Sequence, residues 1–227
     1  MAANATTRPS EEDFKLLKER CQMIFDADPS QYHNDASLHR FHKAFLGVDE
    51  TFQAVLKCNK WRREFGVANL SPEDPDILEE LQTMKALILS RRDARERPII
   101  YIAVKKHNAN DRDLDKLTKF IVYLLETACR KCNEEIIDNI CVVFDMKDFT
   151  MQCMDYQFVK TLIWLLSKYF PERLGVCLII NAPMLFYGCW TVIQPWLNEK
   201  TASKVVFVND DQALSEYLCP DALPHDL

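Results

Sequence analysis

Two cysteines separated by two residues are the first feature of this sequence that could do chemistry. Cys129 and Cys132 enclose Arg130 and Lys131 in a C-x-x-C motif. Such a pair is redox-active when it opens a helix, because the helix N-terminus stabilises a thiolate. Here the motif closes a predicted helix, and that end of the helix dipole disfavours an anion. A zinc site would need a second pair at matching spacing, which the sequence lacks, so we interpret the motif as structural.

The other candidates for catalysis or metal binding lack companions. The four glycines, Gly47, Gly66, Gly175 and Gly188, fall in no G-x-G-x-x-G or G-x-x-x-x-G-K-[ST] pattern, which argues against the common phosphate-binding turns. No G-x-S-x-G nucleophile elbow or H-E-x-x-H motif occurs. Asp145 ends a predicted strand, where α/β folds place ligands, but no base or nucleophile accompanies it. We therefore expect a protein that is not an enzyme and that holds no metal and no cofactor.

The composition favours a folded protein without a basic surface. The chain has 227 residues, of which 48% are hydrophobic, and its formal net charge is −6. This length suffices for a sizeable core, whereas the charge argues against a nucleic-acid partner. Residues 1–10 are polar and no apolar run reaches 18 residues, so neither a signal peptide nor a membrane span is expected. Nine irregularly spaced cysteines are then reduced thiols, and we expect a cytoplasmic protein.

Helical periodicity dominates the first 70 residues. Apolar residues recur at helical spacing after Ser10, around Phe41 and after Asp49, and Gly66 ends the third segment. The run Ser71-Pro72-Glu73-Asp74-Pro75 then breaks the pattern. We predict an N-terminal all-helical lobe over residues 1–70 and a second domain over residues 71–227.

Strands and helices alternate in the second domain. Two strands over 86–89 and 99–104 flank a charged turn and predict a hairpin. Continuous apolar strands separated by helices predict parallel pairing, with helices covering the sheet. The sequence therefore predicts an α/β fold with a mixed five-stranded sheet. The remaining elements are expected as strands over 140–144, 176–180 and 204–208 and helices over 114–128, 155–170, 183–197 and 210–217.

Two of these helices, 155–170 and 183–197, are apolar on more than one face. In the second helix the apolar side chains at and around the main stripe are Leu185, Phe186, Trp190, Ile193, Trp196 and Leu197. One interpretation is a deeply buried helix, and the other is a helix with one face against an apolar ligand cavity.

Three motifs follow one another closely in the second domain: Tyr169-Phe170-Pro171-Glu172-Arg173-Leu174, Ile179-Ile180-Asn181-Ala182-Pro183 and Thr201-Ala202-Ser203-Lys204. Their order and spacing closely resemble the CRAL-TRIO lipid-binding family, which includes the secretory-pathway phosphatidylinositol transfer proteins. Upstream likenesses at Leu38-His39-Arg40-Phe41, Arg97-Pro98-Ile99-Ile100-Tyr101 and Val143-Phe144-Asp145 extend the resemblance over about residues 36–218. Met154-Asp155 with Phe158-Val159 is similar to the CRAL-TRIO module of motile-sperm-domain proteins.

The resemblance implies non-enzymatic binding of one phospholipid, of phosphatidylinositol or phosphatidylcholine type, in an apolar pocket. It implies transfer or presentation of that lipid by a cytoplasmic monomer that visits membranes transiently. Glu172, Thr201 and Lys204 would bind the lipid headgroup, and the helix that carries Leu185, Phe186, Trp190, Ile193, Trp196 and Leu197 would be a mobile gate. A Glu172–Arg173 pair and a lysine that caps carbonyls are the structural alternatives for the headgroup residues.

Two departures and two alternative functions stay open. Phe45 stands where such relatives carry a basic residue, and Glu96 stands where they carry the glycine of G-R-P. The lipid is therefore not fixed by the resemblance. The chain is alternatively a lipid-sensing interaction module without transfer activity, or a carrier of a retinoid, tocopherol or haem. Haem would need an axial ligand, for which Tyr187, Cys177 and Cys189 are candidates.

Overall fold

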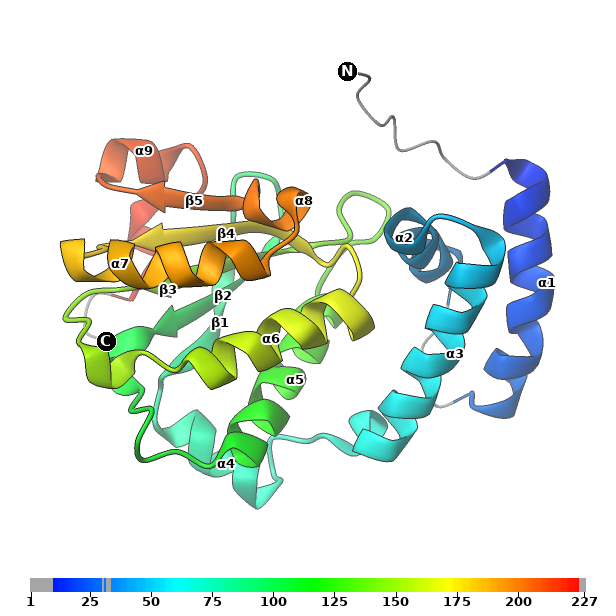
Figure 1. Cartoon of the computed structure of the whole chain (residues 1–227), viewed down its shortest axis with the longest axis horizontal. Helices are drawn as coiled ribbons and strands as arrows, with labels where there is room; N and C mark the ends of the chain where they lie inside the picture. Colours follow the sequence, from blue (N-terminus) through cyan, green and yellow to red (C-terminus); the bar gives the residue numbers. More distant parts are fainter. Residues whose placement is uncertain (1–9, 30, 32–33, 225–227) are drawn as a thin grey trace. The chain divides into compact units, whose positions relative to one another are not determined.

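The computed structural model describes residues 10–29, 31 and 34–224, which form two compact units (Figure 1). The first unit holds the described residues up to Leu70 together with Ser167–Glu172. The second unit holds Ser71–Leu166 and the described residues from Arg173 onward. The sequence assigned residues 167–172 to the second domain. In the structure these six residues belong to the first unit.

The N-terminal part of the first unit is helical, as the sequence predicts. Ser10 begins the first helix by accepting a hydrogen bond from the Asp13 backbone amide at 3.0 Å. Gly66 ends the third helix with a φ of 74°, a conformation that glycine adopts without strain. The helices are α1 (Glu11–Ala27), α2 (Asp35–Phe45), α3 (Val48–Phe65) and the 3₁₀ turn η1 (Val67–Asn69).

Apolar side chains from all three helices form the core of the first unit. The fully buried members are Leu17, Cys21, Leu38, Phe41, Val55 and Cys58. The segment Ser167–Glu172 joins this core through Tyr169, whose ring stacks on Trp61 with centroids 3.9 Å apart. Its carbonyl oxygen also lies 3.7 Å from the Cys58 sulfur. The helical core is therefore built from two separate stretches of the chain.

A five-stranded mixed sheet organises the second unit and confirms the predicted fold class. The strands lie in the order β1-β2-β3-β4-β5, with β1 antiparallel to β2 and the other neighbours parallel. They span Ala86–Arg92, Pro98–Ala103, Ile140–Asp145, Leu174–Ile180 and Val205–Val208. The helices of this unit are α4 (Pro75–Gln82), α5 (Leu114–Arg130), α6 (Tyr156–Tyr169, whose last residues belong to the first unit), α7 (Met184–Ile193), α8 (Glu199–Ala202) and α9 (Asp211–Ser215). The 3₁₀ turns are η2 (Val104–Lys106), η3 (Met151–Cys153), η4 (Gln194–Trp196) and η5 (Pro220–Ala222).

Alternate residues of β4 face two different hydrophobic clusters. Val176, Leu178 and Ile180 join a cluster that continues to Leu214 and Leu218 near the chain's end. Cys177 and Ile179 join the cluster beneath α7. This alternation is why the strand is apolar throughout, as expected for a strand buried on both faces.

The predicted helix over 183–197 is shorter in the structure. α7 ends at Ile193, and residues 194–196 form the 3₁₀ turn η4. Pro195 lacks a backbone N–H and its ring crowds the preceding turn, so the α-helix cannot run on through it. Trp196 therefore lies in η4 and Leu197 lies beyond it, and neither residue is part of the helix that the sequence assigned them to.

Candidate functional site

Helix α7 has apolar side chains both against the sheet and toward solvent. Phe186, Cys189 and Ile193 are buried. Their neighbours from the sheet and the preceding loops are Phe144, Phe149, Cys177, Ile179, Val205 and Phe207. On the outer side Met184 is 84% exposed and Leu185 is 50% exposed. The helix therefore covers one apolar face of the sheet and presents a second apolar surface outward.

Aromatic rings hold α7 and the turn after it to the sheet. The Phe186 ring meets Phe149 edge-on with centroids 5.4 Å apart. Trp190 meets Phe207 of β5 edge-on at 5.6 Å. In η4 the Trp196 ring lies 5.8 Å from Tyr156 of α6. Five of the six predicted gate residues are buried or half-buried: Phe186, Trp190, Ile193, Trp196 and, beyond the turn, Leu197. Leu185 is exposed.

The T-x-x-K motif covers the end of the short helix α8 and the turn that leads into β5. The Asn198 side chain accepts a hydrogen bond from the Thr201 amide at 2.7 Å and caps α8. The Lys204 ammonium donates to the Leu174 carbonyl oxygen at 2.7 Å. Lys204 therefore caps the carbonyl group of Leu174, the last residue of the Tyr169–Leu174 motif.

Glu172 belongs to the first unit. Its backbone has a φ of 58°, in the left-handed region. Its carboxylate lies 3.3 Å from the ammonium of Lys43, and its side chain is only 11% exposed. Arg173 belongs to the second unit, where its guanidinium binds Glu134 at 2.7 Å. The sequence analysis did not identify Lys43, although it lies two residues after the Leu38-His39-Arg40-Phe41 motif.

Three residues from separate motifs meet at the carboxyl end of β3. The buried Asp145 carboxylate accepts hydrogen bonds from the Tyr101 hydroxyl at 2.5 Å and from the Asn181 side-chain amide at 2.8 Å. The carboxylate also accepts a hydrogen bond from the backbone amide of Lys147 at 2.9 Å. Burial and the Asp145 charge raise the pKa of Tyr101, so this hydroxyl stays protonated and acts as a donor. Asp145 thus organises three segments, namely β2, the turn at Lys147 and the residue that follows β4.

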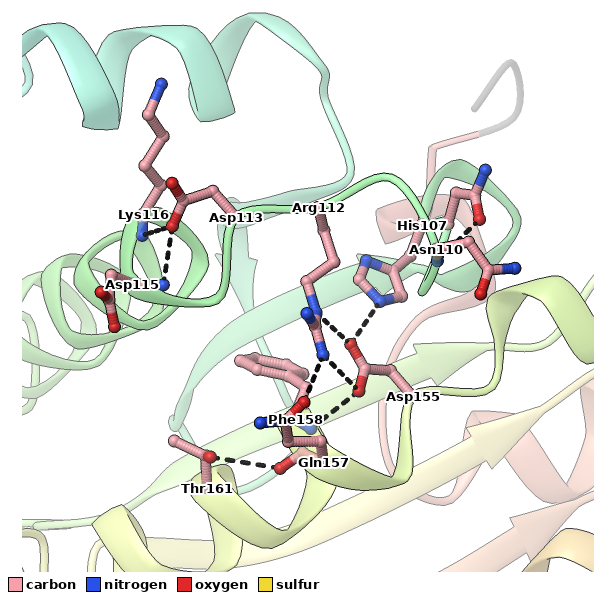
Figure 2. Close-up of polar contacts among 11 residues, drawn as sticks. His107, Asn110, Arg112, Asp113, Asp115, Lys116, Asp155, Gln157, Phe158 and Thr161 are labelled. Carbon is pink, nitrogen blue, oxygen red and sulfur yellow. Dashed lines mark hydrogen bonds and ion pairs between the residues drawn. The ribbon is translucent and has the colours of Figure 1, made fainter.

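A second buried carboxylate, Asp155, anchors the start of α6 (Figure 2). Its oxygens accept from Arg112 Nε at 2.7 Å and from the Phe158 amide at 2.9 Å, and His107 Nε2 lies 3.2 Å away. Arg112 Nη2 also donates to the Gln157 side chain at 3.0 Å. The sequence did not indicate that His107 and Arg112 meet Asp155, because both precede it by more than 40 residues.

The pKa values of His107 and Asp155 both lie below their ordinary values, for different reasons. Burial lowers the pKa of His107, and its contact with Asp155 offsets only part of that effect. Burial raises the pKa of Asp155, but the hydrogen bonds from Arg112 and Phe158 and the Arg112 charge outweigh it and bring the pKa below its ordinary value. The cluster therefore favours a neutral imidazole beside an ionised carboxylate.

Metal ligands and membrane-spanning helices are not found in the described part of the chain. Among residues 10–29, 31 and 34–224, no three His, Cys, Asp or Glu side chains are grouped so as to hold a metal ion. None of the helices in those ranges has the length and apolarity required to cross a bilayer.

Comparison with known proteins places these features in a family. The CRAL-TRIO domain-containing protein C3H8.02 of Schizosaccharomyces pombe is 33% identical over 195 residues, which are 82% of this chain and 44% of that protein. The phosphatidylinositol transfer protein CSR1 of Eremothecium gossypii is 30% identical over 66% of this chain and 34% of its own length. This chain therefore spans less than half the length of these two relatives. The Sec14 cytosolic factor of Schizosaccharomyces pombe is 27% identical over 86% of this chain and 74% of that protein.

The fold is also found in a solved structure. The crystal structure of Sfh5 aligns with 96% of this chain and 85% of that protein, with a TM-score of 0.75 and 18% sequence identity. The profile of the CRAL/TRIO domain matches residues 82–227, which include all five strands of the sheet and the whole of α7. The chain belongs to the CRAL/TRIO domain family.

Proposed function

We propose that this chain binds a single phospholipid, of phosphatidylinositol or phosphatidylcholine type, and transfers or presents it between membranes without any covalent step. Relatives named as phosphatidylinositol transfer proteins support the lipid class. The observation that carries the proposal is the double apolar character of α7, with Phe186 and Ile193 inside and Met184 and Leu185 outside. A helix that only completes a core has no need of the second surface.

In this proposal α7 and η4 form the gate over the lipid. When the gate moves away from the sheet, the acyl chains lie on the apolar face that Cys177, Ile179 and Phe207 now share with α7. Each buried CH₂ group contributes about 0.8 kcal/mol, so two acyl chains can offset the contacts that Phe186 and Trp190 lose. Exchange between these two sets of apolar contacts needs no catalytic group.

The outward surface of α7 meets the membrane. Met184, Leu185 and Val192 are exposed on this helix, and Lys160, whose ammonium lies 4.6 Å from the Trp196 ring centre, stands beside η4. Apolar side chains flanked by a cation suit the boundary between lipid headgroups and acyl chains. Partition of this surface into the interface is the step that opens the gate, and the protein otherwise resides in the cytoplasm as a monomer.

The headgroup contacts are Thr201 and Lys204 in the second unit. A lysine neutralises a phosphate, and a threonine hydroxyl can donate to phosphate or accept from an inositol hydroxyl. Glu172, with Lys43 beside it in the first unit, is a third proposed contact that rests on the resemblance alone.

The test is native mass spectrometry of the chain after incubation with mixed liposomes, followed by a liposome exchange assay with labelled phosphatidylinositol and phosphatidylcholine. A stoichiometric phospholipid that moves between vesicles supports the proposal. A bound lipid without transfer points to a sensing module, and a retinoid, tocopherol or haem mass points to another carrier. A protein that stays empty contradicts the proposal.

A further inference from the structure

The C-x-x-C motif at the end of α5 forms a closed turn. The Cys132 amide donates a hydrogen bond to the Cys129 carbonyl oxygen at 3.1 Å, and Lys131 between them has helical φ and ψ of −83° and −8°. A four-residue turn of this kind keeps its first and last Cα atoms within about 7 Å. A disulfide needs Cα atoms about 4.4–6.8 Å apart. The backbone already provides the separation that a bond between the two cysteines requires.

A largely buried guanidinium, that of Arg173, interacts with both thiols from outside the motif. Arg173 donates to the Asp138 carbonyl oxygen at 2.6 Å and to the Glu134 carboxylate at 2.7 Å. Burial disfavours its charge, but attraction from Cys129, Glu134 and Cys132 outweighs that effect and raises the pKa of Arg173. The helix end alone would disfavour a thiolate. Arg173 supplies the opposing positive charge that a reactive cysteine needs.

The two thiols have different surroundings. The Cys132 sulfur lies 3.7 Å from the Ala128 carbonyl oxygen and 3.6 Å from the Asn139 carbonyl oxygen, so its proton is held by acceptors. Of the two, Cys129 interacts more strongly with the Arg173 charge. Both residues are partly exposed. Cys129 is therefore suited to attack first, and Cys132 is suited to respond.

Most of the other cysteines are buried and inert. Burial raises the pKa of Cys21 to about 11 and that of Cys177 to about 12, and it also raises the pKa of Cys141. Cys219 is exposed, with its sulfur 4.0 Å from an Arg91 nitrogen, and no second cysteine lies near it in the sequence. Cys219 is thus a control that has exposure and a cation but no partner thiol in a shared turn.

We propose that Cys129 and Cys132 are a peroxide-responsive dithiol that closes to an intramolecular disulfide. The Cys129 thiolate attacks one oxygen of hydrogen peroxide, the O–O bond breaks, and the departing hydroxide takes the proton that Cys129 released. The Cys132 sulfur then attacks the sulfenic sulfur of Cys129, the S–O bond breaks, and this hydroxide leaves as water with the Cys132 proton. Two thiols lose two electrons and two protons, and peroxide is reduced to two waters.

Differential alkylation of the full chain tests this proposal. The reduced protein is exposed to hydrogen peroxide, its remaining thiols are alkylated, and its peptides are measured by mass spectrometry. The peptide with Cys129 and Cys132 is expected to lose both alkyl groups together and to regain them after treatment with dithiothreitol. Cys219 has no partner thiol within a few residues, so its alkylation should not be lost in step with that of another cysteine.

Three variants separate the roles of the residues. Cys132→Ser should leave a sulfenic acid on Cys129 that dimedone traps, whereas Cys129→Ser should give no such adduct on Cys132. Glu134→Gln removes the carboxylate that pairs with Arg173 but keeps the Arg173 guanidinium. Oxidation of Cys129 and Cys132 should therefore persist in this variant, even if the turn is loosened. Loss of the alkyl group from Cys129 without its loss from Cys132, or a stable sulfenic acid at Cys129 in the unmodified sequence, would overturn the proposal.

Discussion

The Lys204 ammonium donates a hydrogen bond to the carbonyl oxygen of Leu174, 30 residues earlier in the chain. The bond joins the T-x-x-K motif to the end of the Pro171–Leu174 motif, and it also fixes the side chain that we propose for the lipid phosphate. An ammonium group has three donors, and this contact uses one of them. A lysine held in this way is placed before the ligand arrives, which reduces the entropy lost on binding.

Lys204→Ala should weaken phosphatidylinositol binding while sparing phosphatidylcholine. A charge-assisted hydrogen bond contributes about 1.5–3 kcal/mol, so the preference for phosphatidylinositol should fall roughly 10- to 100-fold. Competition between the two lipids in native mass spectrometry measures that ratio. Lys200→Ala is the matched control, because Lys200 lies exposed in the short helix α8, four residues before Lys204. An equal loss of both lipids would show that Lys204 does not select phosphatidylinositol and acts through the phosphate that both lipids share or through folding.

Replacing Met184 and Leu185 together by serine should impair association with vesicles. Both side chains are at least half exposed on α7, so their removal costs little folding stability but takes away apolar area that enters the interface. Sedimentation with liposomes should show a several-fold loss of binding, with an unchanged melting temperature. Ile136→Ser removes an apolar side chain of 68% exposure outside α7 and should leave vesicle binding intact. Equal losses in both variants would exclude α7 as the membrane surface.

Gly175→Ala should destabilise the fold, whereas Gly188→Ala should not. A methyl group at Gly175 would collide with the Asn139 side-chain oxygen and come within 2.7 Å of Arg97 Nη1. Arg97 cannot move easily, because its Nε donates to the buried Asp93 carboxylate at 2.5 Å. Overpacking of this kind costs about 1–3 kcal/mol. Chemical denaturation measures the difference.

Gly188 is the control for that substitution. A methyl group there meets no atom within 4 Å, and the position lies inside α7, where alanine is favoured over glycine by roughly 0.5–1 kcal/mol. Gly188→Ala should therefore be neutral or slightly stabilising. If both variants were equally stable, the side chains of Asn139 and Arg97 would be able to move away from a methyl group at position 175.

The His107–Asp155 cluster predicts two steps in the dependence of stability on pH. The pKa of His107 is lower in the fold than its ordinary value of 6.5, so the unfolded chain binds the proton more tightly. Stability is then complete above about pH 6.5 and decreases as the pH falls below it. The pKa of Asp155 lies below its ordinary value of 3.8. Its contribution is therefore present above about pH 3.8 and is lost on further acidification.

Melting temperatures between pH 8 and pH 3, on the scale of these pKa values, test both steps. His107→Gln should flatten the upper step and leave the lower one, and Asp155→Asn should remove the lower step. His39→Gln, which replaces a ring stacked on Phe14 in the first unit, should keep the upper step. If that variant flattened the step instead, the titration would belong to the helical unit.

The fold could be predicted from the sequence because its signals are local. Strands β2, β3 and β4 are runs of branched and aromatic residues, and the glycine at position 66 ends a helix that it follows directly. The end of α7 was misjudged because the apolar spacing continues through Trp196 and Leu197, although Pro195 interrupts the backbone pattern. Periodicity describes side chains, and it cannot detect the loss of a backbone donor.

Much of the candidate site could not be predicted, because long-range register brings its residues together. Tyr101 reaches Asp145 only because β2 and β3 pair in parallel with Ala103 opposite Asp145. The same limit applies to the cysteine motif. The helix dipole was visible in the sequence, but the charge that opposes it comes from Arg173, more than 40 residues later. Proposed headgroup roles for Glu172, Thr201 and Lys204 stay predictions.

The chain leaves the first unit between Leu70 and Ser71, returns at Ser167 and leaves again after Glu172. No single cut in the polypeptide separates the two units. A fragment ending at residue 70 would lack Tyr169, which stacks on Trp61 and receives the Cys58 thiol, and a fragment beginning at residue 71 would carry that aromatic segment without its partners. The helical lobe is therefore not a detachable module, and gene fusions or deletions that shuffle whole domains must keep both units in one reading frame.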